Sequence, residues 1–158
     1  MNLNLKDITV IIVTYKSDNI IQKCLSTLPS ESQKIIVENS NNINLEKDLK
    51  AKYDNIEVIL SQNIGMGSGN NLGIKSCKTR YAFILNPDTQ FKNDTVDKLL
   101  NSLTKVSDFA IATPVNDNPK LPNYKKVNSS ESIDNSILSV DTIDGFSMLL
   151  NLNNFKDK

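Results

Sequence analysis

The most chemically suggestive residues of the sequence follow its fourth apolar run. Tyr81–Leu85 ends abruptly at Asn86, Pro87 and Asp88, so a buried strand would place a carboxylate at the rim of a sheet. Mg²⁺ in proteins commonly takes one or two carboxylates and completes its shell with substrate phosphates and water. One aspartate beside one asparagine suits such an open site. The alternative is a proline-containing turn in which Asp88 bonds its own backbone.

A glycine-rich segment, Asn63–Gly73 (NIGMGSGNNLG), forms a loop that leads into a short predicted helix. It fails the dinucleotide-binding fingerprint, because Asn70 and Leu72 stand where a third glycine or alanine is needed and because it follows the third strand. The Gly-Lys-Ser/Thr of a P-loop is missing too. Glycines before a helix still let backbone N–H groups approach an anion. We expect a ligand-facing loop; the alternative is a tight turn that packs the helix on the sheet.

The composition removes several classes of function. The 158 residues include no histidine, which removes the Ser-His-Asp triad, a histidine general base and the usual zinc sites. Acid–base and metal chemistry must therefore rest on carboxylates. Lys plus Arg balances Asp plus Glu at 18 each, so we expect no nucleic acid partner, which would require a basic surface. The two cysteines form no CxxC pair and indicate a reduced, cytoplasmic protein.

Alternating apolar runs and helical segments would position these residues. Helices are expected at Asn19–Leu28, at Leu45–Tyr53, from the glycine-rich loop to Lys78, and from Asn93 or Asp94 to Lys105. Strands are expected at Ile8–Thr14, Lys34–Glu38, Ile56–Leu60, Tyr81–Leu85 and Phe109–Thr113. The alternation indicates an α/β domain with a mostly parallel sheet flanked by helices and joined by right-handed crossovers.

The last third of the chain has a weaker pattern. Residues 114–139 are rich in Asn, Pro, Ser and Lys and predict a flexible surface loop. Val140–Leu150 regains a strand-like pattern around Gly145. The length fits one domain over residues 1–158, and Ile8–Val13 is too short an apolar run to cross a bilayer.

Polar or glycine-rich residues follow each of the first four predicted strands. In open α/β sheets, ligands bind at the carboxyl ends of the strands. We therefore expect the four strand ends to form one shared pocket. The segments concerned are Thr14-Tyr15, Glu38-Asn39-Ser40, Asn63–Gly73 and Asn86–Asp88.

Five segments, taken together, resemble family 2 glycosyltransferases of the GT-A fold, particularly their bacterial rhamnosyltransferase-like branch. The resemblance covers nearly the whole chain in the family's order and spacing. It implies a Rossmann-like domain that binds a nucleoside-diphosphate sugar linked to UDP or dTDP. The segments are VIIVTYKS (10–17), IIVENSNN (35–42), QNIGMGSGNNLGI (62–74), FILNPDT (83–89) and DGFSMLL (144–150).

The resemblance implies a donor-binding role for several residues. Thr14 and Tyr15 would line the pocket of the nucleotide base. Glu38 stands where the family usually has aspartate and would accept a hydrogen bond from the base N–H. Many relatives have arginine at position 70. Base, ribose and diphosphate would be bordered by Asn63, Gly65, Asn70 and Asn71.

The resemblance also implies a metal-assisted reaction. Asn86-Pro87-Asp88 occupies the position of the family's DxD motif, which leaves Asp88 as the principal ligand of a divalent cation, Mg²⁺ or Mn²⁺. The expected reaction is inverting sugar transfer to a glycan or lipid-linked acceptor, with a carboxylate as general base. In relatives that base lies beyond the segment corresponding to Asp144–Leu150. We therefore expect a truncated, donor-binding part that binds donor weakly and transfers sugar poorly or not at all.

Two other functions are compatible with parts of the sequence. The first is a non-catalytic nucleotide-sugar-binding or interaction module. The second, a sugar nucleotidyltransferase, fits less well, because its glycine-rich loop would follow the first strand, where Tyr15–Asp18 stands. The branch resembled implies a bacterial surface polysaccharide as the product and a cytoplasmic protein, including a peripheral one at the inner face of the membrane. The sugar, the general base and the oligomeric state are not assigned.

Overall fold

The computed structural model describes residues 4–106, 108–116, 118–120 and 137–155. Within them, six strands form one mixed sheet in the order β3-β2-β1-β4-β6-β5. This arrangement confirms the expected α/β class. The strands are β1 (Ile8–Thr14), β2 (Gln33–Glu38), β3 (Ile56–Leu60), β4 (Tyr81–Leu85), β5 (Ile111–Ala112) and β6 (Ser147–Asn151).

Strand β1 is the centre of the parallel part of the sheet. Its seven residues are all buried, as expected for a β-branched run that is covered on both faces. It pairs in parallel with β2 on one side and with β4 on the other, and β2 pairs in parallel with β3. The carboxyl ends of four strands therefore lie along one edge of the sheet.

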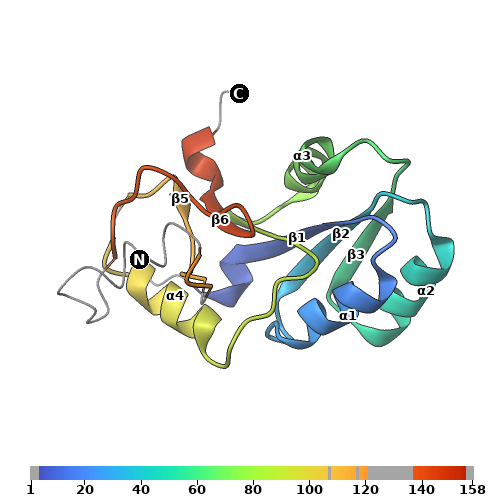
Figure 1. Ribbon diagram of the computed structural model, residues 1–158, viewed down its shortest axis with the longest axis horizontal. Coiled ribbons are helices and arrows are strands. Elements are labelled where there is room, and N and C mark those ends of the chain that lie inside the picture. Colours follow the sequence, from blue (N-terminus) through green and yellow to red (C-terminus); the bar gives the residue numbers. More distant parts are fainter. Residues whose placement is uncertain (1–3, 107, 117, 121–136, 156–158) are drawn as a thin grey trace.

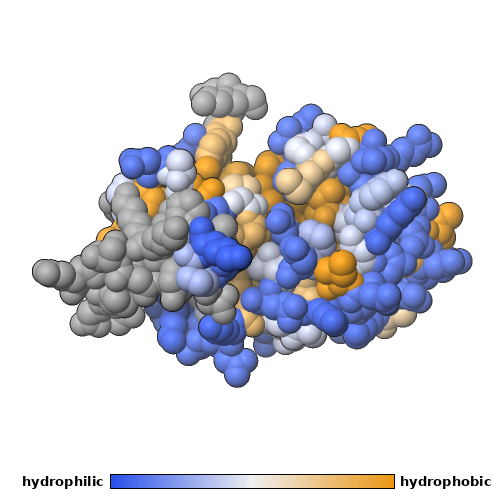
Figure 2. Space-filling view, viewed as in Figure 1, coloured by the Kyte–Doolittle hydropathy of each residue, from blue (hydrophilic) through white to orange (hydrophobic). Residues whose placement is uncertain are grey.

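The helices divide unequally between the two faces of the sheet (Figure 1). Helix α3 (Met66–Ser76) lies on one face, and α1 (Asp18–Ser26), α2 (Ile43–Lys52) and α4 (Thr95–Leu103) lie on the other. Two apolar clusters result, one on each side of the strands. The outer surfaces of α1 and α2 are mostly hydrophilic, whereas hydrophobic residues gather beneath α3 (Figure 2).

The far side of the sheet is antiparallel. Strand β6 pairs antiparallel with β4 over five residues, and β5 pairs antiparallel with β6. The expected strand Phe109–Thr113 is reduced to the two residues of β5. Strand β6 thus lies between β4 and β5 in the sheet. The alternation of helices and strands could not predict this position, because β6 comes from the segment after the irregular residues and not from a β–α–β unit.

The irregular segment is described in part. Residues 113–116 and 137–140 have no regular secondary structure. Residue 117 and residues 121–136 of the expected flexible loop lie outside the described residues. Within the described part of the chain, none of the helices has the length and apolar character needed to cross a membrane.

Candidate functional site

The ends of β1, β2 and β3 lie side by side with the loop that enters α3. Thr14 is opposite Glu38 in the β1–β2 register, and Glu38 is opposite Leu60 in the β2–β3 register. Asn39 connects the ends. Its backbone N–H donates to the Thr14 carbonyl (2.8 Å), and its Nδ2 donates to the Gly65 carbonyl (3.2 Å). We call Thr14, Asn39 and Gly65 the strand-end junction.

Two buried oxygens of the strand-end junction have no hydrogen-bond partner. They are Asn39 Oδ1 and Thr14 Oγ1, whose residues are 2 % and 1 % exposed. A buried polar atom without a partner is unfavourable, and most such atoms in folded proteins are satisfied by protein, water or ligand. Because Gly65 fixes the amide through Nδ2, Asn39 offers Oδ1 as an acceptor. A ligand N–H placed there would satisfy it.

The Glu38 side chain is directed into its own turn. Its carboxylate is fully buried and accepts hydrogen bonds from Ser40 N, Ser40 Oγ and Asn42 N. Asn42 in turn caps helix α2, where its Oδ1 accepts from Asn44 N and Leu45 N. The carboxylate therefore stabilises the β2–α2 turn. Sequence reasoning included Asn39 in the strand-end segment Glu38–Ser40 but assigned the acceptor role to Glu38.

Tyr15 and Lys16 extend the strand-end junction toward solvent. Tyr15 is 45 % exposed, and the Lys16 ammonium lies 5.3 Å from the centre of its ring. Lys16 adopts a positive φ of 51°, an uncommon conformation that turns the chain sharply after β1. An exposed aromatic ring beside buried acceptors is suited to stacking against a planar ring of a ligand.

The glycines of the α3 loop have two different functions. Gly65 has a φ of +81°, which favours glycine, and it leaves open space where a side chain would be, as does Gly67. Gly69 and Gly73 instead pack α3 on β1, because a Cβ would lie 2.8 Å from Val13 Cγ1 and 2.4 Å from Ile11 Cγ2, respectively. The packing interpretation of the loop therefore holds for Gly69 and Gly73, and the ligand-facing interpretation stays a prediction for Gly65 and Gly67.

The other predicted residues of this segment lie just before Gly65 and within helix α3. The side chain of Asn63 is exposed, and its Oδ1 accepts from the Gly65 N–H (3.2 Å). Asn70 and Asn71 lie in the second turn of α3, half-buried and exposed, respectively.

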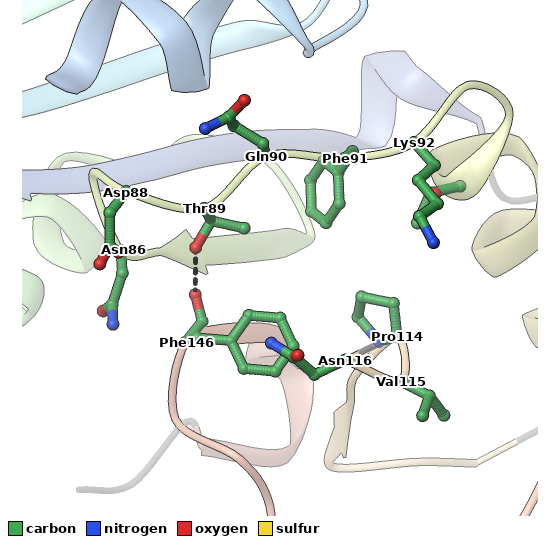
Figure 3. A pocket seen from close by; sticks show the side chains of 11 residues that line it. Asn86, Asp88, Thr89, Gln90, Phe91, Lys92, Pro114, Val115, Asn116 and Phe146 are labelled. Carbon is green, nitrogen blue, oxygen red and sulfur yellow. Dashed lines mark hydrogen bonds between the residues drawn. The ribbon is translucent and has the colours of Figure 1, made fainter. Parts of the chain in front are cut away.

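A separate cavity of about 380 Å³, the β4 cavity, lies at the end of β4 (Figure 3). The segment after β4 forms one wall, and residues 114–116 and Phe146 form the other. Thr89 Oγ1 donates across to the Phe146 carbonyl (3.0 Å), which also accepts from the Asn86 N–H (2.9 Å). The lining residues are Asn86, Asp88, Thr89, Gln90, Phe91, Lys92, Thr95, Pro114, Val115, Asn116 and Phe146.

Helix α1 supports the same segment from the other side. Cys24 Sγ lies 3.8 Å from the Asn86 carbonyl, and Thr27 Oγ1 accepts from the Phe91 N–H (3.2 Å). The ring of Phe91 stacks on Phe83 of β4, with centroids 5.6 Å apart. Burial, and secondarily the Asp88 carboxylate, raise the pKa of the Cys24 thiol to about 12. This thiol therefore remains protonated at neutral pH.

The β4 cavity offers an open set of ligands for a hard cation. Asp88 is exposed and Asn86 is half-buried, and both line the cavity. Among the described residues there is no group of three or more His, Cys, Asp or Glu side chains placed to hold a metal. One carboxylate and one amide oxygen fit a cation that takes its remaining ligands from phosphate and water. They would not form a closed protein cage.

The predicted site residues thus divide between two adjoining regions. The prediction of one shared pocket is wrong for the β4 cavity. Asn86 and Asp88 line this cavity. The seven other predicted site residues do not line it: Thr14, Tyr15, Glu38, Asn63, Gly65, Asn70 and Asn71. Sheet order makes the regions neighbours, because β1 lies between β2 and β4. Adjacent strands are about 4.8 Å apart.

Fold and site together define an α/β domain with polar residues at the carboxyl ends of its parallel strands, and sequence comparison identifies the family. The family model for glycosyl transferase family 2 matches residues 9–151. The chain therefore belongs to glycosyl transferase family 2. One relative is the low-salt glycan biosynthesis hexosyltransferase Agl10 of Haloferax volcanii, 28% identical over 115 residues, which covers 70% of this chain and 36% of the relative.

Solved structures show the same fold. The mannosyltransferase PcManGT from Pyrobaculum calidifontis, in complex with GDP-Man and Mn²⁺, has a TM-score of 0.71 at 13% identity and covers 94% of this chain. Residues 1–349 of S. aureus TarS in complex with UDP have a TM-score of 0.65 at 15% identity and cover 95%. The present chain spans 46% and 49% of those two chains.

Proposed function

We propose that this chain binds a nucleoside-diphosphate sugar as the donor for glycosyl transfer. The base would lie at the strand-end junction and the diphosphate at the β4 cavity. The observation that carries this proposal is the placement of Asp88 and Asn86 in a cavity next to two buried, unpartnered acceptors. The solved relatives that contain GDP-Man with Mn²⁺, or UDP, support it.

At the strand-end junction, the nucleotide base would be recognised by stacking and by one hydrogen bond. Tyr15 supplies an exposed ring, and Asn39 Oδ1 supplies a fixed acceptor. Uracil, thymine and guanine present a ring N–H to such an acceptor, whereas cytosine and adenine present a ring nitrogen that is itself an acceptor. The acceptor therefore favours UDP-, dTDP- or GDP-linked donors. Glu38 would act indirectly by holding the turn.

The residues of the β4 cavity would bind the charged part of the donor. Asp88, with Asn86, would hold Mg²⁺ or Mn²⁺ against the donor diphosphate. When bound, the cation offsets the negative charge that develops on the departing nucleoside diphosphate. Thr89, Cys24 and Thr27 would hold the Asp88 segment in place through the contacts described above.

The reaction would be inverting glycosyl transfer to a glycan or a lipid-linked acceptor. The acceptor oxygen forms a bond to the anomeric carbon as the bond from that carbon to the diphosphate oxygen breaks. The acceptor proton leaves to a base, and the electron pair of the broken bond remains on the diphosphate. We place the protein in the cytoplasm, including the inner face of the membrane.

The decisive experiment measures donor binding with and without cation. We expect UDP-, dTDP- or GDP-sugar to raise the melting temperature more in Mn²⁺ than in EDTA, because a ligand of the native state stabilises it by mass action. Asp88→Ala should abolish the Mn²⁺-dependent part of the shift. Asp48→Ala, an exposed aspartate of α2, is the matched control. Equal shifts in Asp88→Ala and wild type would sink the proposed cation site.

A second measurement separates transfer from binding alone. Acceptor-dependent release of nucleoside diphosphate supports the transferase, and donor binding without such release supports the non-catalytic binding module. If no nucleotide sugar binds at all, both the transferase and the binding-module proposals are wrong.

A further inference from the structure

Lys16, the second residue after strand β1, has a backbone conformation that its residue type seldom takes. Among the described residues, three that are not glycine have a positive φ: Lys16, Asn41 and Asp94. Asparagine and aspartate are enriched in this conformation, because their short polar side chains can bond to the nearby backbone, whereas lysine has no such advantage. Uncommon backbone conformations cluster at functional sites. The side chain of Lys16 is therefore a candidate for a specific contact.

The Lys16 ammonium is available to an anion. None of the ion pairs found in the described part of the chain includes this side chain. The nearest carboxylate in the sequence, that of Asp18, accepts a hydrogen bond from Asn42 Nδ2 (2.7 Å). The ammonium lies 5.3 Å from the centre of the Tyr15 ring, and such a contact is weak at an exposed site. An anionic ligand could therefore take its place.

The position of Lys16 lies between the two regions assigned to the donor. Strand β1 ends at Thr14 and lies between β2 and β4 in the sheet. The strand-end junction is on the β2 side of this end, and the β4 cavity is at the end of β4. Neighbouring strands are about 4.8 Å apart. A nucleotide with its base at the junction and its diphosphate toward the cavity therefore crosses the end of β1, where Lys16 follows.

The backbone on both sides of Lys16 is held in place. The Lys16 N–H donates to Ser40 Oγ of the β2–α2 turn (3.4 Å), and Ser17 Oγ donates to the Tyr15 carbonyl (2.9 Å). These bonds fix the point from which the long side chain starts. In a nucleotide, the group that follows the base and the ribose is the α-phosphate. Hydrogen bonds from an ammonium to a phosphate are charge-assisted and stronger than neutral ones.

We propose that Lys16 binds the α-phosphate of the nucleotide and determines the preference of this chain for a nucleotide over a nucleoside. This inference rests on the proposed function, because it assigns a further contact to the same donor. The contact needs no divalent cation, whereas Asp88 would act through Mg²⁺ or Mn²⁺. The uncommon conformation of Lys16 is thus linked to a charge at the crossing between base and diphosphate.

The test compares nucleosides with nucleoside monophosphates in EDTA, so that no divalent cation contributes. Uridine, thymidine, guanosine and their monophosphates are titrated into the isotope-labelled whole chain and followed by NMR. The best monophosphate should bind at least tenfold more tightly than its nucleoside. Lys16→Asn should weaken the monophosphate at least fivefold and change nucleoside binding less than twofold. Lys16→Arg keeps the charge and should remain within threefold of the wild type. Lys23→Asn, at an exposed lysine of α1, should match the wild type.

Thermal unfolding of the same variants separates binding from folding. Because asparagine is better suited to a positive φ, Lys16→Asn should melt at or above the temperature of the wild type while it binds the monophosphate less tightly. A residue with a structural role alone would not produce this combination.

Four results would overturn the inference. An unchanged monophosphate affinity in Lys16→Asn, or equal losses for nucleoside and monophosphate, would exclude the phosphate contact. Lys16→Arg binding as weakly as Lys16→Asn would exclude a role for the charge. Binding of a nucleotide sugar in Mn²⁺ without monophosphate binding in EDTA would defeat this inference alone. If the wild type binds neither nucleotide nor nucleotide sugar, with or without Mn²⁺, the proposed function fails and this inference fails with it.

Discussion

Glu38 and Asn39, neighbours at the end of β2, have different structural roles. Glu38 has the charge, but its carboxylate is fully buried and accepts hydrogen bonds from three donor groups of the next four residues. Asn39 is neutral, yet its Oδ1 is buried without a partner at the strand-end junction. The availability of an acceptor, and not its charge, thus selects Asn39 as the candidate contact to a base.

Replacement of Asn39 tests that contact. We expect Asn39→Ala to weaken donor binding about tenfold, which corresponds to one hydrogen bond to a buried acceptor, about 1.4 kcal/mol. Calorimetric titration with the best donor in Mn²⁺ measures it. Asn101→Ala, on the exposed side of α4, controls for a general effect of the substitution. An unchanged donor affinity in a folded Asn39→Ala protein would move the base elsewhere.

Cys24 makes stability depend on alkaline pH. Its thiol has an ordinary pKa of 9.0 in the unfolded chain and a pKa raised to about 12 in the folded protein, chiefly by burial. Between these values the unfolded chain has lost the proton that the folded protein keeps. Stability is therefore fully present below pH 9 and falls as pH rises, by at most about 1.4 kcal/mol per pH unit.

Urea unfolding at pH 8 to 11 detects this dependence. Cys24→Ala should be less stable at pH 8 because of the cavity it leaves, but its stability should fall less steeply with pH than that of the wild type. Cys77→Ala controls for the loss of a thiol. Parallel curves for Cys24→Ala and wild type would contradict the assignment.

At the scale of elements, helix α3 depends on two glycines for its distance from the sheet. Gly69 and Gly73, one helical turn apart, face Val13 and Ile11 of β1. Because the added Cβ at Gly73 would lie 2.4 Å from Ile11 Cγ2, α3 cannot approach as closely with any larger residue. Close approach is what keeps Gly65 within reach of Asn39.

Alanine substitutions separate packing from loop conformation. Gly73→Ala should destabilise the protein by about 1–3 kcal/mol through overpacking. Gly67→Ala, in the same helix but with open space around the added Cβ, should be neutral or more stable by up to about 1 kcal/mol. Chemical denaturation measures both. A stable Gly73→Ala protein would show that α3 can shift without cost.

The segment that carries Asp88 is braced by two elements from distant parts of the sequence. Helix α1 holds it through Cys24 and Thr27, and the residue before β6 holds it through the Phe146 carbonyl. We infer that Thr89 is a positioning residue for Asp88, because its hydroxyl donates to that carbonyl while the adjacent side chain lines the cavity.

Conservative variants of Thr89 test this role. Thr89→Val keeps the volume but loses a hydrogen bond worth about 1 kcal/mol, and we expect it to weaken Mn²⁺-dependent donor binding threefold to tenfold. Thr89→Ser keeps the hydroxyl and should restore the affinity. Binding in EDTA should be equal in all three proteins. If Thr89→Ser behaves like Thr89→Val, the methyl group matters and the hydroxyl does not.

For the whole molecule, the limits of the elements could be predicted from the sequence better than the pairing of the strands. Strands Ile8–Thr14, Ile56–Leu60 and Tyr81–Leu85 have the expected limits, because mostly apolar runs with clear ends define them. The antiparallel insertion of β6 between β4 and β5 was not foreseen, since periodicity reports burial and not pairing partners. For the same reason, only one wall of the β4 cavity could be predicted. Asp88 could be placed at a strand end, but the opposite wall at Phe146 depends on that pairing.

The position of β6 in the sheet has a consequence for the order of synthesis. A ribosome delivers the chain from its N-terminus, so β1 to β4 leave the exit tunnel at least 60 residues ahead of Ser147–Asn151. During that interval β4 has an unpaired edge, an exposed template for intermolecular pairing. The Asp88 segment meanwhile has its contacts to α1 and lacks its contact to Phe146. A nascent chain would therefore form most of its core early and add the β6 side chains and the candidate cation site last.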